Sequence, residues 1–391
     1  MTTKKVVVFA AGRPDFARLA RLITRLDEDP DIECIFINSG QHSHTDVLDR
    51  AFIENLGLRK PDHNLNIGRD GADWSDQIAS IFLLLPGLLN RIKPDAFINL
   101  GDMNPCLSGL IAKRLGIKYV RIECAMRSGS IYSAYKNFDL PEEINRVAMD
   151  SIADLKLVYC HEYVYHLIRE GHLPDSIKVV GNTIVEALDY YTEKWHITPT
   201  IGDYDLVTFH RGNNMNPSNL SYFVTLLNHL YGTGKRAKFV CYGRTRKMLE
   251  RLDLLKKIPE SVEILDSQTQ EDFLRLVAGC NIIVSDSGST SSEESHYFHK
   301  PCLILRDSTE RPSTLITNNK TDGNAVLWSQ HITQDTTKYN ILSVMPRTWN
   351  NRYYDAHNGQ PVSMNIIDAI KEFLQVNESK CSGKCDGCSH K

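Results

Sequence analysis

Two groups of polar residues in this 391-residue chain have the types and spacing of a chemical site. The first is Ser285-Asp286-Ser287-Gly288, which follows an apolar run at 280–284 that is typical of a buried strand. A serine–glycine turn between a strand and a helix leaves backbone N–H groups open to an anion such as a phosphate. Glu293 and Glu294 follow one turn later, where carboxylates suit the hydroxyls of a ribose. The alternative interpretation is a serine-rich helix cap with a capping-box glutamate.

The second group consists of charged residues that come directly after apolar runs of strand length. Asp102 follows the run 96–100, and Glu123 follows the run 118–122. Carboxylates at the ends of neighbouring strands repel each other, so they are typical of acid–base chemistry or of cation binding. His210 ends a similar run in the second half of the chain.

Two further candidates have ordinary structural alternatives. Arg13 follows the first apolar run, where it would face a ligand or form a surface ion pair. Glu142 and Glu143 come after Pro141, and acids at this position also suit a plain helix N-terminus.

These residues need a scaffold that brings strand ends together. Short apolar runs alternate with helical spacing of apolar residues along most of the chain, which predicts an α/β protein with two consecutive doubly wound domains. The turn at 11–15 lacks the Gly-x-Gly-x-x-Gly pattern, so a nicotinamide cofactor is not indicated. Because both domains carry polar residues at strand ends, we expect the ligand in a cleft between them.

Composition excludes several classes of protein. A net charge of −3 argues against a nucleic-acid binder. The sequence contains no apolar run of about 18 residues, so we expect no membrane span. The N-terminus lacks the features of a signal peptide, so we expect a cytoplasmic protein. Seven of the ten cysteines are scattered in apolar segments, as small core residues are.

Metal binding has two weak candidates. The spacing of His42 and His44 suits either a metal or a solvated loop. The tail carries Cys381, Cys385, Cys388 and His390, which form a zinc ligand set by type. Because these residues are closely spaced at the terminus with no scaffold around them, we expect a disordered tail and no metal site.

Taken together, the chain resembles the UDP-N-acetylglucosamine 2-epimerases up to about residue 374. The similar motifs occur in the family's order. They are Gly12-Arg13-Pro14-Asp15, Gly101-Asp102, Glu123 with Arg127 (similar to the family's Glu-Ala-Gly-Leu-Arg), Pro141-Glu142-Glu143-Ile144-Asn145-Arg146, Gly181-Asn182-Thr183, His210-Arg211, Asp286-Ser287-Gly288 with Glu293-Glu294, and Arg306-Asp307-Ser308-Thr309-Glu310-Arg311-Pro312. The serine–glycine motif is one residue longer than the family's Asp-Ser-Gly-Gly-x-Gln-Glu-Glu.

The resemblance implies a fold of two Rossmann-like domains, as in the B-type glycosyltransferases. The N-terminal domain, 1–183, would carry the acid–base residues, and the C-terminal domain, 184–362, would bind UDP. A helix at 363–377 would pack back on the first domain, followed by the Cys-rich tail 378–391. The resemblance also implies a homodimer.

The implied reaction inverts C2 of a UDP-sugar through UDP elimination, a glycal intermediate and UDP re-addition. It needs no metal or redox cofactor. The implied acid–base residues are Asp102, Glu123 and Glu142, and His210 would assist the departing phosphate. The implied substrate-binding residues are Arg13, Arg18, Arg127, Ser287, Gly288, Glu293, Glu294 and Arg311.

Departures from the family's motifs leave the substrate open. Arg18 replaces a family lysine, and Tyr242-Gly243 replaces a His-Pro. The motifs at 101–108 and 244–247 resemble the branch that acts on UDP-6-deoxy-L-hexosamines, whereas the segment 128–133 resembles the UDP-N-acetylglucosamine branch. Alternative functions are a hydrolysing 2-epimerase, which would release UDP and free N-acetylmannosamine, a glycosyltransferase on the same fold, and a non-catalytic UDP-sugar-binding protein.

Overall fold

The computed structural model describes residues 3–41, 53–68, 73–128, 140–316, 323–328, 337–345, 347–348 and 359–380, apart from the side chains of Arg13, Asn213, Thr337 and residues 376–380. Three sequence predictions lie outside these residues: the metal hypotheses for His42 and His44 and for the tail beyond residue 380, and the branch-type motif beyond Ser128. The chain divides into two compact units. The first contains the described parts of 1–126, 136–187 and 354–391, and the second those of 127–135 and 188–353.

The first unit is built on a parallel sheet of seven strands in the order β3-β2-β1-β4-β5-β6-β7. The strands are β1 (Lys4–Ala10), β2 (Ile32–Asn38), β3 (His63–Asn64), β4 (Ala96–Leu100), β5 (Lys118–Ile122), β6 (Leu155–Val158) and β7 (Ile177–Val179). All five residues of β4 are buried, as expected for a parallel strand that is covered on both faces.

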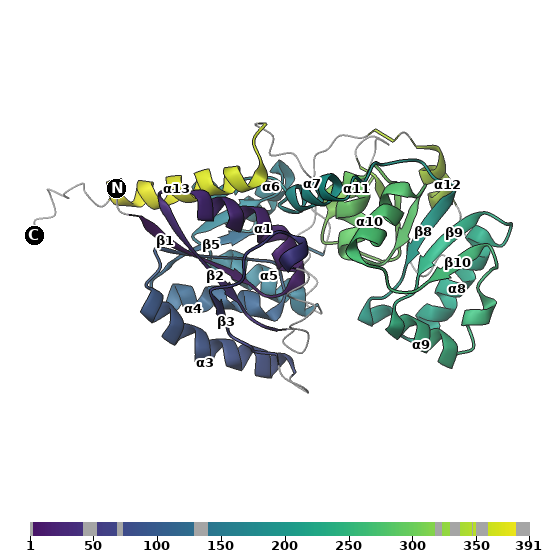
Figure 1. Ribbon diagram of the computed structural model, residues 1–391, viewed down its shortest axis with the longest axis horizontal. Coiled ribbons are helices and arrows are strands. Elements are labelled where there is room, and N and C mark those ends of the chain that lie inside the picture. Colours follow the sequence, from purple (N-terminus) through teal and green to yellow (C-terminus); the bar gives the residue numbers. More distant parts are fainter. Residues whose placement is uncertain are drawn as a thin grey trace, which may run out of the picture. The chain divides into compact units, whose positions relative to one another are not determined.

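Helices cover both faces of this sheet. They are α1 (Arg13–Glu28), α3 (Trp74–Ile92), α4 (Ser108–Arg114), α5 (Pro141–Ile152), α6 (His161–Arg169), α7 (Ile184–Lys194), which continues into the second unit, and α13 (Val362–Lys380). The helices α1 and α13 lie side by side on one face, and α3 and α4 lie on the other (Figure 1). The helix α13 reaches Lys380, three residues beyond the predicted end at 377.

The second unit repeats the architecture with six parallel strands in the order β10-β9-β8-β11-β12-β13. The strands are β8 (Tyr204–Thr208), β9 (Arg236–Val240), β10 (Val262–Leu265), β11 (Ile283–Ser285), β12 (Cys302–Ile304) and β13 (Ala325–Leu327). The helices are α8 (Pro217–Tyr231), α9 (Gly243–Arg251), α10 (Gln270–Gly279), α11 (Ser295–Tyr297) and α12 (Thr337–Val344). The predicted class of two doubly wound α/β domains is therefore confirmed.

The strand order of each sheet reverses at one point. In the first sheet, β1, β2 and β3 follow one another toward one edge, and β4 to β7 follow one another toward the other edge. In the second sheet, β8 to β10 and β11 to β13 are arranged in the same way. Ligands of such sheets bind beside the carboxyl ends of the strands at this reversal. None of the helices in the described residues is both long and apolar enough to cross a membrane.

The packing of α13 on the first unit gives a test of the fold. Ile370 is fully buried, so Ile370→Ala should lower the unfolding free energy by roughly 2–5 kcal/mol through the cavity it leaves. The matched control is Glu372→Ala on the same helix, which removes an exposed ion pair with Lys178 and should cost at most about 0.5 kcal/mol. Urea unfolding measures both values, and equal costs would show that α13 does not pack as described.

Candidate active site

The first cluster of polar residues lies beyond the carboxyl ends of β1, β4 and β5. Asp102 comes two residues after β4, and Glu123 comes directly after β5. The two strands are hydrogen-bonded neighbours with Leu100 opposite Ile122. The prediction that Asp102 and Glu123 end adjacent strands is therefore confirmed.

A third carboxylate, which the sequence did not single out, joins this cluster. Asp15 lies in the first turn of α1, is 2% exposed, and accepts the backbone N–H of Ala11 through Oδ2 at 2.7 Å. A Cβ added at Gly101 would lie 3.4 Å from Asp15 Oδ1 and 4.0 Å from Glu123 Oε2. Burial raises the pKa of Asp15 to about 7, and the charges of Glu123 and Asp102 add to this shift against the opposing effects of the Ala11 N–H and of Arg18.

Two arginines neutralise part of this negative charge. Arg18 places Nε 3.9 Å from Glu123 Oε2. Arg146 on α5 pairs with Asp102 Oδ2 and, through Nη2 at 2.8 Å, with Glu143 Oε2. Glu143 is fully buried, so this carboxylate orients Arg146 and, through it, Asp102.

Three other residues that were predicted for the site in the first half of the chain lie outside this carboxylate cluster or are only partly described. Glu142 is exposed in the first turn of α5, so its acid–base role stays a prediction. The backbone of Arg13 begins α1, and its side chain is outside the described atoms. Arg127 is buried at 3% exposure and is grouped with the second unit.

The second cluster lies where β8 and β11 end. Asp286 is fully buried and accepts the backbone N–H groups of His210 at 3.0 Å and Arg211 at 2.9 Å. It also accepts the side-chain amide of Asn214 at 2.9 Å. One carboxylate thus fixes the loop after β8 against the end of β11.

Gly288 sits inside a cage of charged side chains. A Cβ at this position would lie 2.8 Å from Glu310 Oε1, 2.9 Å from Arg211 Nη2 and 3.4 Å from Arg311 Nη1. Glu310 itself pairs with Arg306 at 2.9 Å and with Arg311 at 2.8 Å. Guanidinium groups gathered beside a glycine backbone are the donors that an oxyanion or phosphate site uses, and here they are balanced by Glu310 and by Glu293, which lies 3.4 Å from Arg311.

The extra residue in the serine–glycine motif is absorbed by an unusual turn. Residues Thr290–Glu294 form a π-helical turn before α11. Such a turn uses i→i+5 hydrogen bonds and holds one residue more than an α-turn. Ser287 Oγ accepts the N–H of Thr290 at 3.3 Å, whereas Ser289 at the N-cap of this turn makes no side-chain capping bond.

The two glutamates in this turn have different surroundings. Glu293 is fully buried, with Oε1 3.4 Å from Arg311 Nη2. Glu294 is 9% exposed, and its charge is the next cause after burial that raises the pKa of the Tyr242 phenol to about 12. The structure therefore separates a glutamate paired with Arg311 from one whose charge acts on Tyr242.

His210 lies between the buried carboxylate and an aromatic ring. Its Nδ1 is 3.5 Å from Asp286 Oδ1, and its ring meets Tyr242 edge-on at a centroid distance of 5.0 Å. Burial lowers the pKa of the imidazole, and the charge of Asp286 opposes this shift. A bound anion would favour the protonated form in the same way as Asp286 does.

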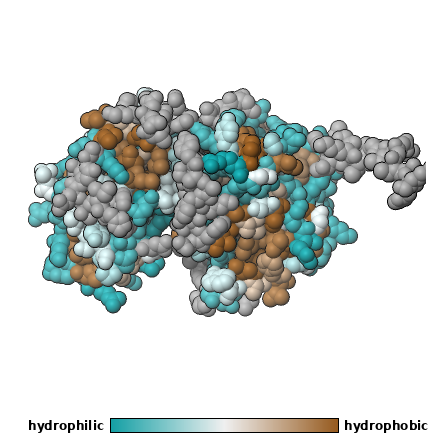
Figure 2. Space-filling view, turned by 180° about the vertical axis from the view of Figure 1, so that it is seen from behind, coloured by the Kyte–Doolittle hydropathy of each residue, from teal (hydrophilic) through white to brown (hydrophobic). Residues whose placement is uncertain are grey.

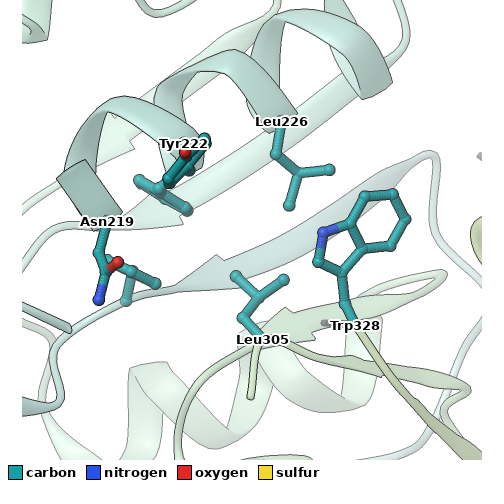
Figure 3. A pocket seen from close by; sticks show the side chains of 7 residues that line it. Asn219, Tyr222, Leu226, Leu305 and Trp328 are labelled. Atoms are coloured by element: carbon teal, nitrogen blue, oxygen red, sulfur yellow. The ribbon is translucent and has the colours of Figure 1, made fainter. Parts of the chain in front are cut away.

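A small apolar pocket beside this cluster is too small to be the site (Figure 3). Its volume is about 30 Å³, which suits one or two water molecules. It lies between α8 and the residues after β12 and β13, and is lined by Phe209, Asn219, Tyr222, Phe223, Leu226, Leu305 and Trp328. Phe209 stacks on Phe223 at 4.3 Å and so anchors the chain directly before His210.

Within the described residues, no group of three or more His, Cys, Asp or Glu side chains is arranged to hold a metal ion. The cysteines of this part of the chain are free, and six of the seven are buried, as predicted for core residues. The side chains that were assigned no role in the site from the sequence are Asp15, Glu143, Arg146, Arg211, Asp286, Arg306 and Glu310. All of them lie inside motifs already recognised, and the i,i+3 spacing of Glu143 and Arg146 was a readable sign of an ion pair.

The raised pKa of Asp15 predicts a pH-dependent stability. The folded protein holds this proton up to about pH 7 whereas the unfolded chain releases it near pH 3.8, so the contribution is complete below pH 3.8 and is lost as the pH rises toward 7. Relative to Asp15→Asn, the parent should therefore lose roughly 4 kcal/mol of unfolding free energy between pH 4 and pH 8.

Urea unfolding of both proteins across this pH range measures the difference in their unfolding free energies. The contributions of the other titrating groups are the same in both proteins and cancel in this difference. The control Asp95→Asn replaces a carboxylate that also accepts a backbone N–H, that of Lys5, but is 39% exposed. A pH-independent difference for Asp15→Asn would contradict the assignment.

Comparisons with known proteins identify the family of the chain. The sequence profile described as UDP-N-acetylglucosamine 2-epimerase matches residues 24–367. A UDP-N-acetylglucosamine 2-epimerase of Methanococcus maripaludis is 30% identical over 94% of this chain and 99% of its own length. A UDP-2,3-diacetamido-2,3-dideoxy-D-glucuronate 2-epimerase of Pseudomonas aeruginosa is 26% identical over 78% of this chain and 84% of its own.

A solved structure extends the likeness to three dimensions. The crystal structure of the UDP-GlcNAc 2-epimerase of Methanocaldococcus jannaschii in complex with UDP-GlcNAc and UDP has a TM-score of 0.79 and 28% identity, and the match covers 94% of this chain and 99% of that one. The strand-end carboxylates, the arginine cage and the profile match over most of the chain lead to one conclusion: the chain belongs to the UDP-N-acetylglucosamine 2-epimerase family, a family of isomerases.

Proposed function

We propose that this protein is a non-hydrolysing 2-epimerase that inverts C2 of a UDP-N-acetylhexosamine. The observation that carries the proposal is that one chain of this family has both a cluster of carboxylates for acid–base chemistry and a cluster of arginines for phosphate binding. Carboxylates gather where β4 and β5 end, and arginines surround Gly288 where β11 ends.

The second unit would bind UDP. The diphosphate would lie against the backbone of Ser287 and Gly288, with Arg211 and Arg311 as charge partners. The ribose hydroxyls would be accepted by Glu294, because the carboxylate of Glu293 already pairs with Arg311 in the interior. We therefore assign the ribose to Glu294 in this proposal.

The first unit would supply the acid and the base. A carboxylate takes the proton from C2 while the C1–O bond to UDP breaks, and the electron pair of that bond leaves with the β-phosphate oxygen. The glycal that remains has a C1=C2 double bond. A second acid then protonates C2 from the opposite face as UDP re-adds at C1, so the number of atoms and charges is unchanged.

Four carboxyl groups are available for these two roles. Glu123 and Asp102 are the proposed pair, because both end adjacent strands and each has an arginine partner. Asp15 stands beside them with a pKa of about 7, which allows it to hold a proton near neutral pH. Glu142 remains a candidate for the second acid. His210 would stabilise the departing phosphate, and Arg13, Arg18 and Arg127 would complete the charge balance.

Two relatives and two motif patterns bear on the substrate. The M. maripaludis relative is named for UDP-N-acetylglucosamine, and the P. aeruginosa relative for a diacetamido glucuronate. We propose conversion of UDP-N-acetylglucosamine to UDP-N-acetylmannosamine. The motifs at 101–108 and 244–247 make UDP-6-deoxy-L-hexosamines, such as UDP-L-RhaNAc converted to UDP-L-QuiNAc, the next substrates to test. Release of free N-acetylmannosamine would assign the hydrolysing reaction in place of the reversible one.

A homodimer is the assembly we propose. Adjacent residues of α3 expose apolar side chains, with Phe82 39%, Leu83 80% and Leu84 45% exposed, and Leu110 on the neighbouring α4 is 37% exposed. In the view from behind, apolar side chains gather in patches on the surface (Figure 2). Exposed apolar surface favours contact with another protein surface.

Sedimentation of the parent and of a variant in α3 tests this assembly. The parent should sediment at about twice 44.4 kDa, and Leu83→Glu should sediment as a monomer because it would bury a charge in the contact. Leu173→Glu is the matched control, since Leu173 is 74% exposed in the same unit but lies outside α3. A monomeric parent would exclude the dimer.

The acid–base assignment predicts a separation of binding from chemistry. Glu123→Gln should bind UDP with a Kd within about threefold of the parent, because UDP contacts the second unit. Its exchange of the C2 proton with solvent should fall by about 10²- to 10⁴-fold, the usual effect of losing a general acid or base. Glu33→Gln, an exposed carboxylate on β2, is the control. Calorimetry and proton NMR measure the two quantities, and a fully active Glu123→Gln would remove Glu123 from the mechanism.

A further inference from the structure

A buried ion pair lies in the core of the first unit, next to the loops that carry the carboxylates. Arg121 on β5 donates from Nε to Asp150 Oδ1 on α5 at 2.7 Å. The side chains are 0% and 1% exposed, so the pair is sealed from water. Neither residue belongs to the motifs from which the site was predicted.

Each partner also contacts one of the two loops that carry the site. Arg121 donates from Nη2 to the carbonyl of Gly101 at 2.7 Å, directly before Asp102. Asp150 accepts the backbone N–H of Ala125 through Oδ2 at 2.8 Å, two residues after Glu123. The pair therefore connects the loop after β4 to the loop after β5.

The loop after β5 has a backbone conformation that needs such support, whereas the loop after β4 has a glycine at its position of positive φ. Gly101 has a φ of +77°, Glu123 of +66° and Ala125 of +70°. Side chains other than glycine rarely adopt positive φ, and they keep it only where the surroundings fix it. The family motif has glycine where this chain has Ala125, so the strain at this position is greater here than the motif requires.

The chemistry of the pair fits positioning better than stability alone. A buried ion pair gains little over apolar residues of similar size, because both charges lose their hydration. A lysine in place of Arg121 would offer a single ammonium and could not hold the fixed geometry of a guanidinium that contacts both Asp150 and Gly101. Arg121 thus supplies a donor to the loop after β4, and Asp150 supplies an acceptor to the loop after β5.

We propose that Arg121 and Asp150 are positioning residues for the 2-epimerase reaction, which hold Asp102 and Glu123 in register across the ends of β4 and β5. This inference rests on the proposed function of the two carboxylates. It goes beyond that function because it assigns the geometry of the reacting groups to residues that do not touch the substrate.

The first test is Asp150→Asn, which removes the charge that holds Arg121 and weakens the contact with Ala125. We expect kcat to fall by about 10²-fold, the cost of a misplacement of about 1 Å, while KM stays within about threefold because UDP binds to the second unit. The control is Asp205→Asn, a buried carboxylate at the start of β8 that accepts from Tyr231 at 3.2 Å and pairs with Lys235 at 3.2 Å. It should lower Tm but leave kcat within about threefold.

A rescue variant separates positioning from general destabilisation. Glycine adopts positive φ freely, so Ala125→Gly in the Asp150→Asn background should restore kcat at least tenfold. The same change in the parent should have little effect. If Asp150→Asn does not fold, Arg121→Lys replaces it, since it keeps the charge but not the geometry, and the same loss of kcat is expected. A kcat equal to that of the Asp205→Asn control, or no gain from Ala125→Gly, would overturn the proposal.

A readout without turnover keeps this test independent of the proposed function. Hydrogen–deuterium exchange of a peptide covering 121–128 should become at least tenfold faster in Asp150→Asn, because the N–H of Ala125 loses its charged acceptor. Peptides from the second unit should not change. If the parent turns over no UDP-sugar but this peptide exchanges faster, the proposed function fails and the loop support stands. Unchanged exchange would overturn the loop support itself.

Discussion

Parallel strands place their carboxyl ends at a common edge, and every feature of the two candidate clusters depends on this constraint. In the first unit, β4 and β5 pair in register, so the residues that follow them must share one edge of the sheet. In the second unit, the pairing of β8 with β11 brings His210 and Arg211 to the carboxylate of Asp286. Residues that are separated by 20 to 80 positions in the chain thus become neighbours without any local signal between them.

Charge is distributed differently in the two clusters, and the difference suits their proposed tasks. Asp15, Asp102 and Glu123 gather at one edge with Arg18 and Arg146 as partners, and burial, with a smaller contribution from the neighbouring carboxylates, raises the pKa of Asp15. Around Gly288, Arg211, Arg306 and Arg311 gather beside Glu310, so guanidinium donors stand next to a glycine backbone. A diphosphate suits the second arrangement and a weakly acidic C–H group suits the first.

The sequence predicted most strands of both sheets and the adjacency of Asp102 and Glu123, because buried parallel strands form apolar runs and their ends stand out as polar residues. It did not predict the short strands β3 and β13. It did not predict α3, whose apolar stretch is interrupted by Pro86, or the polar helix α9. In α3 the structure retains a proline inside the helix and begins the helix with a capping box at Asp73.

The finer arrangement of the site depends on tertiary contacts that no spacing reveals. Both Glu142 and Glu143 follow Pro141, but only the packing of α5 shows that Glu143 is the buried partner of Arg146. The pair of Arg121 and Asp150 joins residues 29 positions apart and is invisible to any local pattern. The π-turn at Thr290–Glu294 likewise follows from an extra residue whose accommodation only the fold decides.

The most direct measurement is proton NMR of the protein with UDP-N-acetylglucosamine in heavy water. Abstraction of the C2 proton predicts that deuterium replaces it, and that UDP-N-acetylmannosamine forms with deuterium at the same carbon. Product that keeps its original C2 proton would contradict proton abstraction by the strand-end carboxylates. So would the absence of exchange with both UDP-N-acetylglucosamine and the UDP-6-deoxy-L-hexosamines.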